Sequence, residues 1–336
     1  MNNKVTLENL EFIISYISAV DRDICIRVAM GIKSEFGDSG YDTWNYWLQT
    51  DTSYNQREML AVWKSIKLVG AITIATVIYM AKENGFEFSS DTPKLSQDEI
   101  DKRNGKRQAR EVEAKKAFAR KKYYAKESIN KILPELLQTG APMIRYLFNR
   151  GLGLFKTPDS VMFNPSTKYW ENGKFILTPA IVSLITDING HVEALHKIHL
   201  TNNGYKAKVD SPKKISTPIN SIKGCSIKFE WPNDILFLTE GLEDALAIWI
   251  ETKQPVWACI SAYGLQTVEI PGTVKLVYIM ADKDRTEQGE KSANILAQRL
   301  ISKGVIVHIL LPEQDIPNGA KSIDWLDIYN LEKQAA

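Results

Sequence analysis

Carboxylate side chains follow two apolar runs of this chain. Glu240 comes after the run Ile235–Leu238, and Asp282 and Asp284 come after the run Leu276–Met280. Short apolar runs of this kind indicate buried strands. If the two strands are parallel neighbours, their carboxylates converge at the carboxyl edge of a sheet, where open α/β sheets bind ligands. Crowded carboxylates repel one another unless a cation neutralises them, and their hard oxygens suit Mg²⁺ or Mn²⁺. The spacing therefore predicts a divalent metal site beside phosphate.

The elements that position these carboxylates alternate between strand and helix from about Asn233 onward. The predicted elements are Ile235–Leu238, Leu242–Thr252, Val256–Ile260, Leu276–Met280, Glu290–Lys303 and Val305–Leu310. Such alternation predicts a parallel sheet with helices on its faces. Glu243 and Asp244 fall in the first turn of the helix that follows Glu240. We expect Glu243 to be a surface acid.

Three further segments precede this one. Residues 1–88 have helical spacing and predict a small all-α domain, in which Trp44, Trp47 and Trp63 suit a helical core better than base stacking. The longest apolar run, Leu68–Ala81, predicts a buried helix and is too short to span a membrane.

Residues 89–128 are strongly basic. Between positions 101 and 127, eleven Lys or Arg residues face only four acids, which predicts a long exposed helix. A nucleic-acid-binding face and a solvated linker explain this helix equally well.

Residues 129–230 predict a mixed α+β segment. Its expected helices are Lys126–Leu137 and Pro142–Asn149, and its expected strands are Gly173–Leu177, Ala180–Asp187, Ala194–Leu200 and Cys225–Phe229. The residues Asp187–Gly190 indicate a turn between two of these strands.

The segment from residue 231 to 336 resembles the Toprim domain of bacterial primases, topoisomerases and some nucleases. The likeness rests on Glu240-Gly241-Leu242-Glu243-Asp244-Ala245 and on Ala281-Asp282-Lys283-Asp284 with Gly289 and Ser292-Ala293, in forms most similar to primases. Residues 129–230 resemble the region preceding Toprim in primases of plasmids and satellite phages, through Arg145-Tyr146-Leu147, Arg150-Gly151-Leu152 and Gly204-Tyr205-Lys206-Ala207. The first segment resembles a helical domain found carboxy-terminal to primase catalytic cores in mobile elements, through Gly31–Phe36 and Asp42–Trp47. The implied fold class is α/β: a doubly wound parallel Toprim sheet, a mixed subdomain before it, and a separate all-α domain.

The resemblance also implies roles for individual residues. Glu240 would act in acid–base chemistry or bind metal, Asp282 and Asp284 would bind Mg²⁺ or Mn²⁺, and Asp244 would be an outer ligand. Nucleotide or nucleic-acid phosphates would meet a basic set: Arg145, Arg150, Lys197, Lys206, Lys208, Lys283 and Arg285. Asp324 and Asp327 fit either a Toprim tail motif or a helix cap.

The implied activity is Mg²⁺-dependent synthesis of RNA primers from NTPs on single-stranded DNA, as part of the replication of a mobile element. The chain has no zinc-binding cysteine cluster and no phosphate-binding loop of a helicase motor, so we expect no zinc and a helicase or zinc-module protein acting in trans. The alternatives are a non-catalytic replication accessory that binds DNA or a partner, and a Toprim nuclease.

Composition limits the other possibilities. The chain has 336 residues, 44% of them hydrophobic, and a net charge of +2, which is ordinary for a soluble protein. Cys25, Cys225 and Cys259 show no paired spacing and are expected in the core. His196 and His199 are spaced as in a strand. With acids among the first apolar residues and no membrane span, we expect a cytoplasmic protein.

Overall fold

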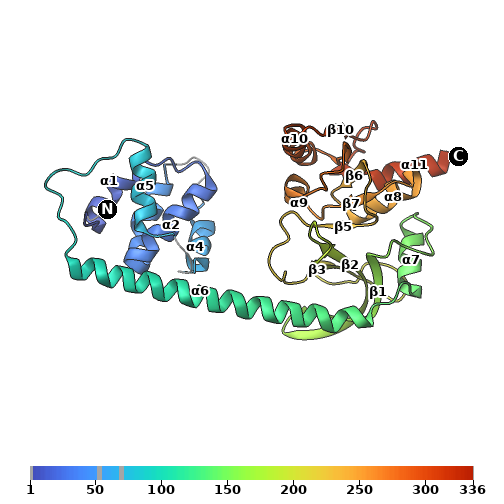
Figure 1. The fold of residues 1–336 in the computed structure, drawn as a ribbon, viewed down its shortest axis with the longest axis horizontal. Helices are drawn as coiled ribbons and strands as arrows, with labels where there is room; N and C mark the ends of the chain where they lie inside the picture. Colours follow the sequence, from blue (N-terminus) through green and yellow to red (C-terminus); the bar gives the residue numbers. More distant parts are fainter. Residues whose placement is uncertain (1–2, 51–54, 68–71, 336) are drawn as a thin grey trace. The chain divides into compact units, whose positions relative to one another are not determined.

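The computed structural model describes residues 3–50, 55–67 and 72–335. Residues 68–71 of the predicted helix Leu68–Ala81 lie outside this range. The chain divides into two compact units, Met1–Arg120 and Lys121–Ala336. The boundary between the units falls within the helix α6 (Gln97–Ile132), drawn in green in Figure 1.

The first unit is helical in the described residues, as predicted. Its core contains Trp44, Trp47 and Trp63, all nearly inaccessible to solvent. Thr73 caps the last helix before α6. The elements are α1 (Leu7–Ile14), α2 (Arg22–Phe36), the 3₁₀ turn η1 (Gly37–Gly40), α3 (Tyr41–Leu48), α4 (Gln56–Ser65) and α5 (Ile74–Glu83).

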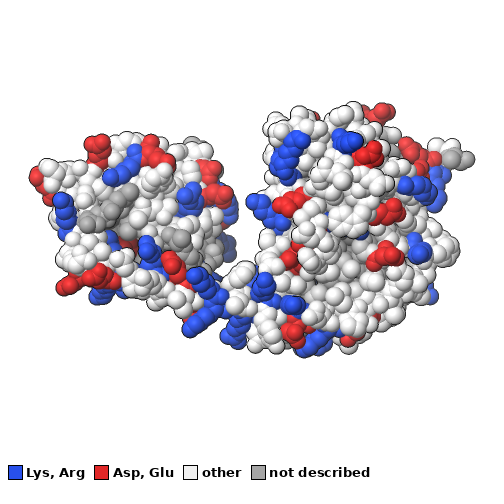
Figure 2. Space-filling model, viewed as in Figure 1, with Lys and Arg blue, Asp and Glu red and all other residues white. Residues whose placement is uncertain are grey.

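Helix α6 carries the basic segment. Only Ala125 and Ile129 among its residues are buried, and Lys and Arg side chains gather along its course in Figure 2. The separate helix predicted over Lys126–Leu137 is wrong: α6 continues without a break to Ile132, and the 3₁₀ turn η2 (Leu133–Glu135) follows. The physical reason is that no residue before Pro134 interrupts the helix.

The second unit is built on one mixed sheet. The strand order is β10-β8-β6-β7-β5-β2-β3-β4, with β1 also paired to β2. The pairs within β10-β8-β6-β7 are parallel, and the remaining pairs are antiparallel. The strands are β1 (Val161–Glu171), β2 (Lys174–Thr186), β3 (Val192–His199), β4 (Lys213–Ile215), β5 (Ser226–Lys228), β6 (Ile235–Thr239), β7 (Val256–Ala258), β8 (Leu276–Met280) and β10 (Ile306–Leu310).

Helices cover both faces of the parallel part of this sheet, as the doubly wound prediction requires (Figure 1). Helices α7 (Ala141–Asn149), α8 (Leu242–Thr252) and α11 (Trp325–Ala335) share one apolar core. Helices α9 (Ala262–Thr267) and α10 (Gln288–Ile301) share the other. All three cysteines are buried, as expected for core residues.

Three details of the strands differ from the prediction. The predicted strands Gly173–Leu177 and Ala180–Asp187 form the single strand β2, because Pro179 lies within the ladder and its carbonyl accepts from the Leu200 N–H. Strand β1 was not predicted because its first half is interrupted by polar residues at a register shift between Asn164 and Thr167. A short two-stranded pair, β9 (Lys283–Asp284) with β11 (Ser322–Ile323), was not predicted either.

Across the described ranges, no helix is both long and apolar enough to cross a bilayer.

Candidate active site

Strands β6 and β8 bring two carboxylates to one edge of the sheet. The strands pair in parallel with Thr239 opposite Met280, so Glu240 and Asp282 lie just beyond neighbouring strand ends. The Ala262 N–H at the start of α9 lies close to the Glu240 carboxylate. Asp244 lies one helical turn after Glu240 and is 5% exposed. We call Glu240, Asp244 and Asp282 the acidic edge.

The carboxylates of the acidic edge are held in an environment that disfavours their charge. Burial raises the pKa of Asp282 to about 8, and the charges of Asp244 and Glu240 add to this shift. Burial also raises the pKa of Asp244 to about 7, with Asp324 as the largest contributing charge. The pKa of Glu240 is raised by burial and by Asp284. Like charges crowded in this way are stabilised when a cation binds among them.

One oxygen at the acidic edge has no partner. Asp282 Oδ1 is buried and accepts no hydrogen bond from any described residue, which is unusual for a buried polar atom. A cation would satisfy it, and carboxylate oxygens are the ligands that Mg²⁺ prefers. Within the described ranges, however, no three His, Cys, Asp or Glu side chains already converge as a ligand set. The donor chemistry fits a divalent cation, and the side chains would have to close around it.

Gly241 is needed because the Asp244 side chain folds back over it. A Cβ atom at residue 241 would lie 2.2 Å from Asp244 Oδ2. The other oxygen, Oδ1, accepts a 3.2 Å hydrogen bond from the Leu326 N–H at the start of α11. The spacing Glu-Gly-x-x-Asp therefore lets the carboxylate of Asp244 return to the strand end beside Glu240.

Asp284 has a different environment from the acidic edge. Its Oδ1 accepts from the Thr286 N–H at 2.8 Å, and its Oδ2 accepts from the Gly289 N–H at 2.9 Å. Burial alone would raise the pKa of Asp284, but these hydrogen bonds lower it to about 2. Asp284 thus fixes the turn into α10 through both carboxylate oxygens. Asp324 likewise caps α11, since its Oδ1 accepts from the Asp327 N–H.

The prediction that Glu243 is a surface acid is wrong. Glu243 is 5% exposed, and its carboxylate accepts a hydrogen bond from the Tyr146 hydroxyl. Arg150 Nε lies 3.1 Å and Lys206 Nζ 3.6 Å from Glu243 Oε1. Lys213 Nζ lies 2.5 Å from Glu243 Oε2. Burial alone would raise the pKa of Glu243, but these partners, Lys213 first, lower it to about 2. We call Glu243, Arg150, Lys206 and Lys213 the cation cluster.

The sequence could not reveal this cluster, because its members come from distant segments. Tyr146 is 97 residues from Glu243, and Lys213 is 30 residues from it. Lys213, the first residue of the short strand β4, was not predicted as a site residue. Burial of Glu243 follows from the cover that α7 and the chain around β4 provide.

The remaining members of the predicted basic set do not join the cation cluster. Arg145 donates to the Asn202 carbonyl, Lys283 to the Gln314 carbonyl and Arg285 to the Ala320 carbonyl. Lys197 is half-buried on β3, and Lys208 is exposed. The structure therefore brings together Arg150 and Lys206 of that set and places the other five elsewhere.

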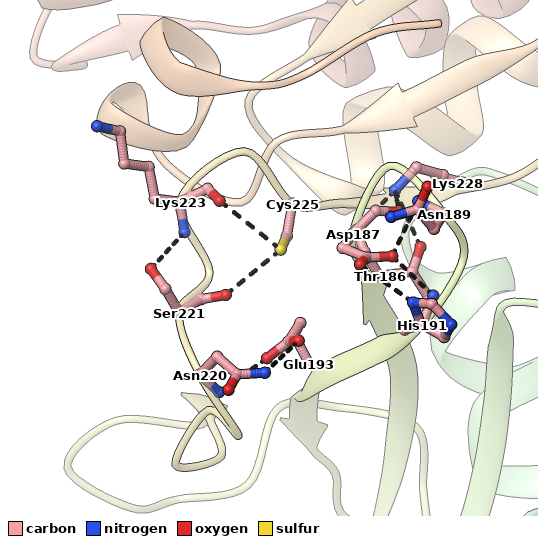
Figure 3. Close-up of polar contacts among 10 residues, drawn as sticks. All are labelled: Thr186, Asp187, Asn189, His191, Glu193, Asn220, Ser221, Lys223, Cys225 and Lys228. Carbon is pink, nitrogen blue, oxygen red and sulfur yellow. Dashed lines mark hydrogen bonds and ion pairs between the residues drawn. The ribbon is translucent and has the colours of Figure 1, made fainter. Parts of the chain in front are cut away.

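A second buried polar group lies where β2 and β5 meet (Figure 3). The Lys228 ammonium donates to the carbonyls of Thr186 and Asp187 at 2.6 and 2.9 Å, and it lies 4.7 Å from the Trp257 ring centre. Burial lowers the pKa of Lys228 to about 8. Because its donors are used within the fold, we interpret Lys228 as a structural residue that closes the end of β2.

Three family models match parts of the chain. Residues 235–334 match the family model described as "Toprim domain", and residues 10–81 match "Primase C terminal 2 (PriCT-2)". Residues 124–226 match "Domain of unknown function (DUF7146)". The chain thus contains a Toprim domain and an N-terminal primase C-terminal domain, which together mark a primase-like replication protein.

Solved structures with similarity to this chain include three primase structures. The primase fragment of the bacteriophage T7 primase-helicase protein is 16% identical, with 57% of this chain and 69% of that chain covered and a TM-score of 0.33. The primase domains of gp4, in a complex with the bacteriophage T7 lagging-strand DNA polymerase, are 14% identical, with 52% of this chain and 79% of that chain covered and a TM-score of 0.33. A DNA primase domain from Pseudomonas aeruginosa is 16% identical, with 47% of this chain and 50% of that chain covered and a TM-score of 0.31. Similarity at this level does not identify a function. No curated protein sequence matches the chain.

Proposed function

We propose that this protein makes RNA primers on single-stranded DNA by Mg²⁺-dependent, template-directed joining of ribonucleotides. The observation that carries the proposal is the acidic edge, where the buried Asp282 keeps an unpartnered oxygen beside Glu240 and Asp244. The presence of a Toprim domain and a primase C-terminal domain supports the same reading. An origin in a mobile element stays a prediction.

The residues of the acidic edge and Asp284, whose charge acts on Glu240 and Asp282, would divide the chemistry between them. Asp282 and Asp244 would hold the Mg²⁺ or Mn²⁺ ion, and Asp284 would join them with the lone pairs that its hydrogen bonds to the turn into α10 leave free. Bound there, the ion would supply positive charge to the phosphates. Glu240 takes the proton of the primer 3′-hydroxyl as that oxygen forms its bond to the α-phosphorus and pyrophosphate leaves with the electrons of the broken P–O bond. A carboxylate with a raised pKa suits this proton transfer near neutral pH.

The cationic side chains would bind phosphate around this centre. Arg150 and Lys206 lie beside Glu243, the residue next to Asp244. Lys and Arg provide affinity for phosphate without reading sequence. The nucleotide and the template strand are therefore the proposed ligands, with unwinding or template selection supplied by a helicase or zinc-module protein in trans.

The test is primer synthesis by the purified full chain with Mg²⁺, NTPs and a single-stranded template. Labelled oligoribonucleotides should appear with the parent protein and be lost with Glu240→Gln and with Asp282→Asn. Asp234→Asn is the matched control, since Asp234 is an exposed carboxylate at the opposite end of β6. If the parent protein makes no template-dependent product, or if Glu240→Gln makes as much as the parent, the proposal is wrong.

One observation favours a non-catalytic alternative, a replication accessory that binds DNA. Helix α6 exposes a basic surface and has only two buried residues, Ala125 and Ile129. Under this alternative, DNA binding would survive Asp282→Asn combined with Asp284→Asn, and no synthesis would be seen. Mg²⁺-dependent nicking of plasmid in the same assay would instead indicate a Toprim nuclease.

A further inference from the structure

One buried carboxylate is surrounded by cations that reach it from other segments. The Glu243 side chain is 7% exposed, whereas those of Arg150, Lys206 and Lys213 are 38%, 39% and 45% exposed. Arg150 follows α7, Lys206 follows β3, and Lys213 begins β4. Three positive charges meet one negative charge, so the cluster has a net charge of +2 and presents its cationic side to solvent.

Glu243 is what holds these cations together. For the Lys206 and Lys213 ammonium groups, the contacts described by the structure are those to Glu243. Without the carboxylate, three like charges at close range would repel, and long flexible side chains would separate. Tyr146, 2% exposed, donates its hydroxyl hydrogen to Glu243 and fixes the carboxylate from the buried side.

The cations keep donors for a further ligand. A lysine ammonium has three N–H groups and a guanidinium has five, and each uses only part of them on Glu243. The cluster also borders the acidic edge: Glu243 precedes Asp244, and the charges of Lys213 and Arg150 act on Asp244 and Asp324, respectively. A phosphate bound by the cations would therefore lie next to the carboxylates.

We propose that Glu243 is a positioning residue that arranges Arg150, Lys206 and Lys213 into a clamp for phosphate oxygens. The identity of the biological ligand rests on the proposed function, but the clamp itself can be tested without any synthesis. The shared chemistry is a chain of linked phosphates, which either a nucleoside triphosphate or a nucleic-acid backbone supplies.

The competing account is that Glu243 is only a counter-ion that occupies the place of the phosphate. The two accounts predict opposite signs. If Glu243 is a counter-ion, its neutralisation frees three cations and phosphate binds more tightly. If Glu243 positions the cations, its neutralisation lets them disperse and phosphate binds more weakly, despite the gain of positive charge.

The experiment measures binding to the full chain in EDTA by calorimetry, with inorganic tripolyphosphate in one arm and a single-stranded oligothymidylate in the other. We expect Glu243→Gln to weaken binding by about tenfold in at least one arm, a typical loss for one charge-assisted contact network. A loss confined to tripolyphosphate assigns the clamp to the nucleotide, and a loss confined to the oligonucleotide assigns it to the template. Because Glu243→Gln removes a buried charge, its unfolding midpoint is measured alongside.

Glu193→Gln is the matched control. Glu193 is also a buried glutamate of this unit, 9% exposed, but its hydrogen bonds come from the backbone and side chain of Asn220 and not from a cation (Figure 3). It should leave both affinities unchanged. Lys213→Met tests the same clamp from the exposed side and should weaken binding even if Glu243→Gln does not fold.

Unchanged or tighter binding by a folded Glu243→Gln variant overturns the inference, and so does unchanged binding by Lys213→Met. The outcome is separable from that of the proposed function. If phosphate binding behaves as expected while no primer is made, only the proposed synthesis fails. If primers are made and phosphate binding is unchanged in Glu243→Gln, only the proposal of the clamp is wrong.

Discussion

The acidic edge and the cation cluster meet on the first turn of α8, where Glu243 and Asp244 are neighbours in the chain. Both side chains are buried, each with 5% of the residue exposed. Yet the pKa of Glu243 is lowered to about 2 because cations outweigh its burial, whereas the pKa of Asp244 is raised to about 7 because burial is reinforced by other carboxylates. Burial therefore does not decide the charge of a carboxylate here; its partners do.

This contrast suggests different roles for the two regions. In the cation cluster the Glu243 carboxylate is already paired with cations from the protein, so we infer that its role is to arrange their donors. The acidic edge keeps an unpartnered oxygen at Asp282, which is why we propose that it receives a cation. We expect the two regions to respond differently to the same chemical change.

The largest difference should appear when a carboxylate of each region is replaced by its amide. Glu240→Gln removes the proposed proton acceptor and should lower kcat by about 10²–10⁴-fold with little change in KM. Glu243→Gln should act mainly on KM, for the nucleotide or for the template according to which of them the clamp binds. Steady-state primer synthesis with varied NTP measures both constants. Equal losses of kcat in the two variants would remove the distinction between the regions.

The next difference concerns pH. Because the pKa of Asp282 is raised from 3.8 to about 8 in the folded protein, the folded state holds its proton more tightly than the unfolded chain. The associated stability is present at low pH and is lost as the pH rises toward 8. In EDTA, the stability of Asp282→Asn relative to the parent should therefore rise between pH 5 and pH 8, by roughly 2–4 kcal/mol.

Urea unfolding at the two pH values measures this effect. Asp234→Asn should follow the parent at both. The cation cluster has the opposite sign: the lowered pKa of Glu243 contributes stability above its usual value of 4.5, and this is lost as the pH falls toward 2. If the stabilities of Asp282→Asn and the parent change in parallel between pH 5 and 8, the pKa of Asp282 is not raised in the folded protein as we describe.

The sequence predicted the acidic edge better than the cation cluster, and the reason is physical. The acidic edge depends on strand ends, and apolar runs bounded by polar residues locate strand ends well: β8 was predicted at its observed bounds, Leu276–Met280, and β6 within one residue. Parallel pairing of the two strands then brings Glu240 and Asp282 to neighbouring ends.

The cation cluster depends on contacts between residues far apart in the chain, which no local pattern encodes. Nothing in the residues around Glu243 shows that Tyr146 and Lys213 will cover it. The same limitation explains β1 and β2. Two strands were predicted with a gap between Leu177 and Ala180, but the Pro179 carbonyl accepts a hydrogen bond from the N–H of Leu200, the residue after β3, and the strand continues. Tertiary pairing decided both cases.

A smaller effect is expected at Gly241, which lies between the two regions. Its backbone angles, φ −88° and ψ 152°, suit any residue, so Gly241→Ala adds no backbone strain. The new Cβ would displace the Asp244 carboxylate, which lies 2.2 Å from that position. We expect a loss of about 1 kcal/mol in stability and about tenfold in apparent Mg²⁺ affinity.

Gly272→Ala is the control for this change, because a Cβ at residue 272 meets no atom within 4 Å. Thermal unfolding and a Mg²⁺ titration of primer synthesis measure the two quantities. Equal Mg²⁺ dependence in Gly241→Ala and the parent would show that the position of Asp244 is unimportant for the cation.

The smallest expected effect distinguishes two lysines of one loop. Lys206 Nζ lies 3.6 Å from Glu243, whereas Lys208 is exposed and lies outside the cation cluster. Because two other cations remain, Lys206→Met should weaken tripolyphosphate binding only about threefold, and Lys208→Met should not change it. Both variants lose one positive charge, so any general effect of net charge cancels in the comparison. If Lys208→Met weakens tripolyphosphate binding as much as Lys206→Met, affinity depends on the total charge of this loop and not on the arrangement that Glu243 provides.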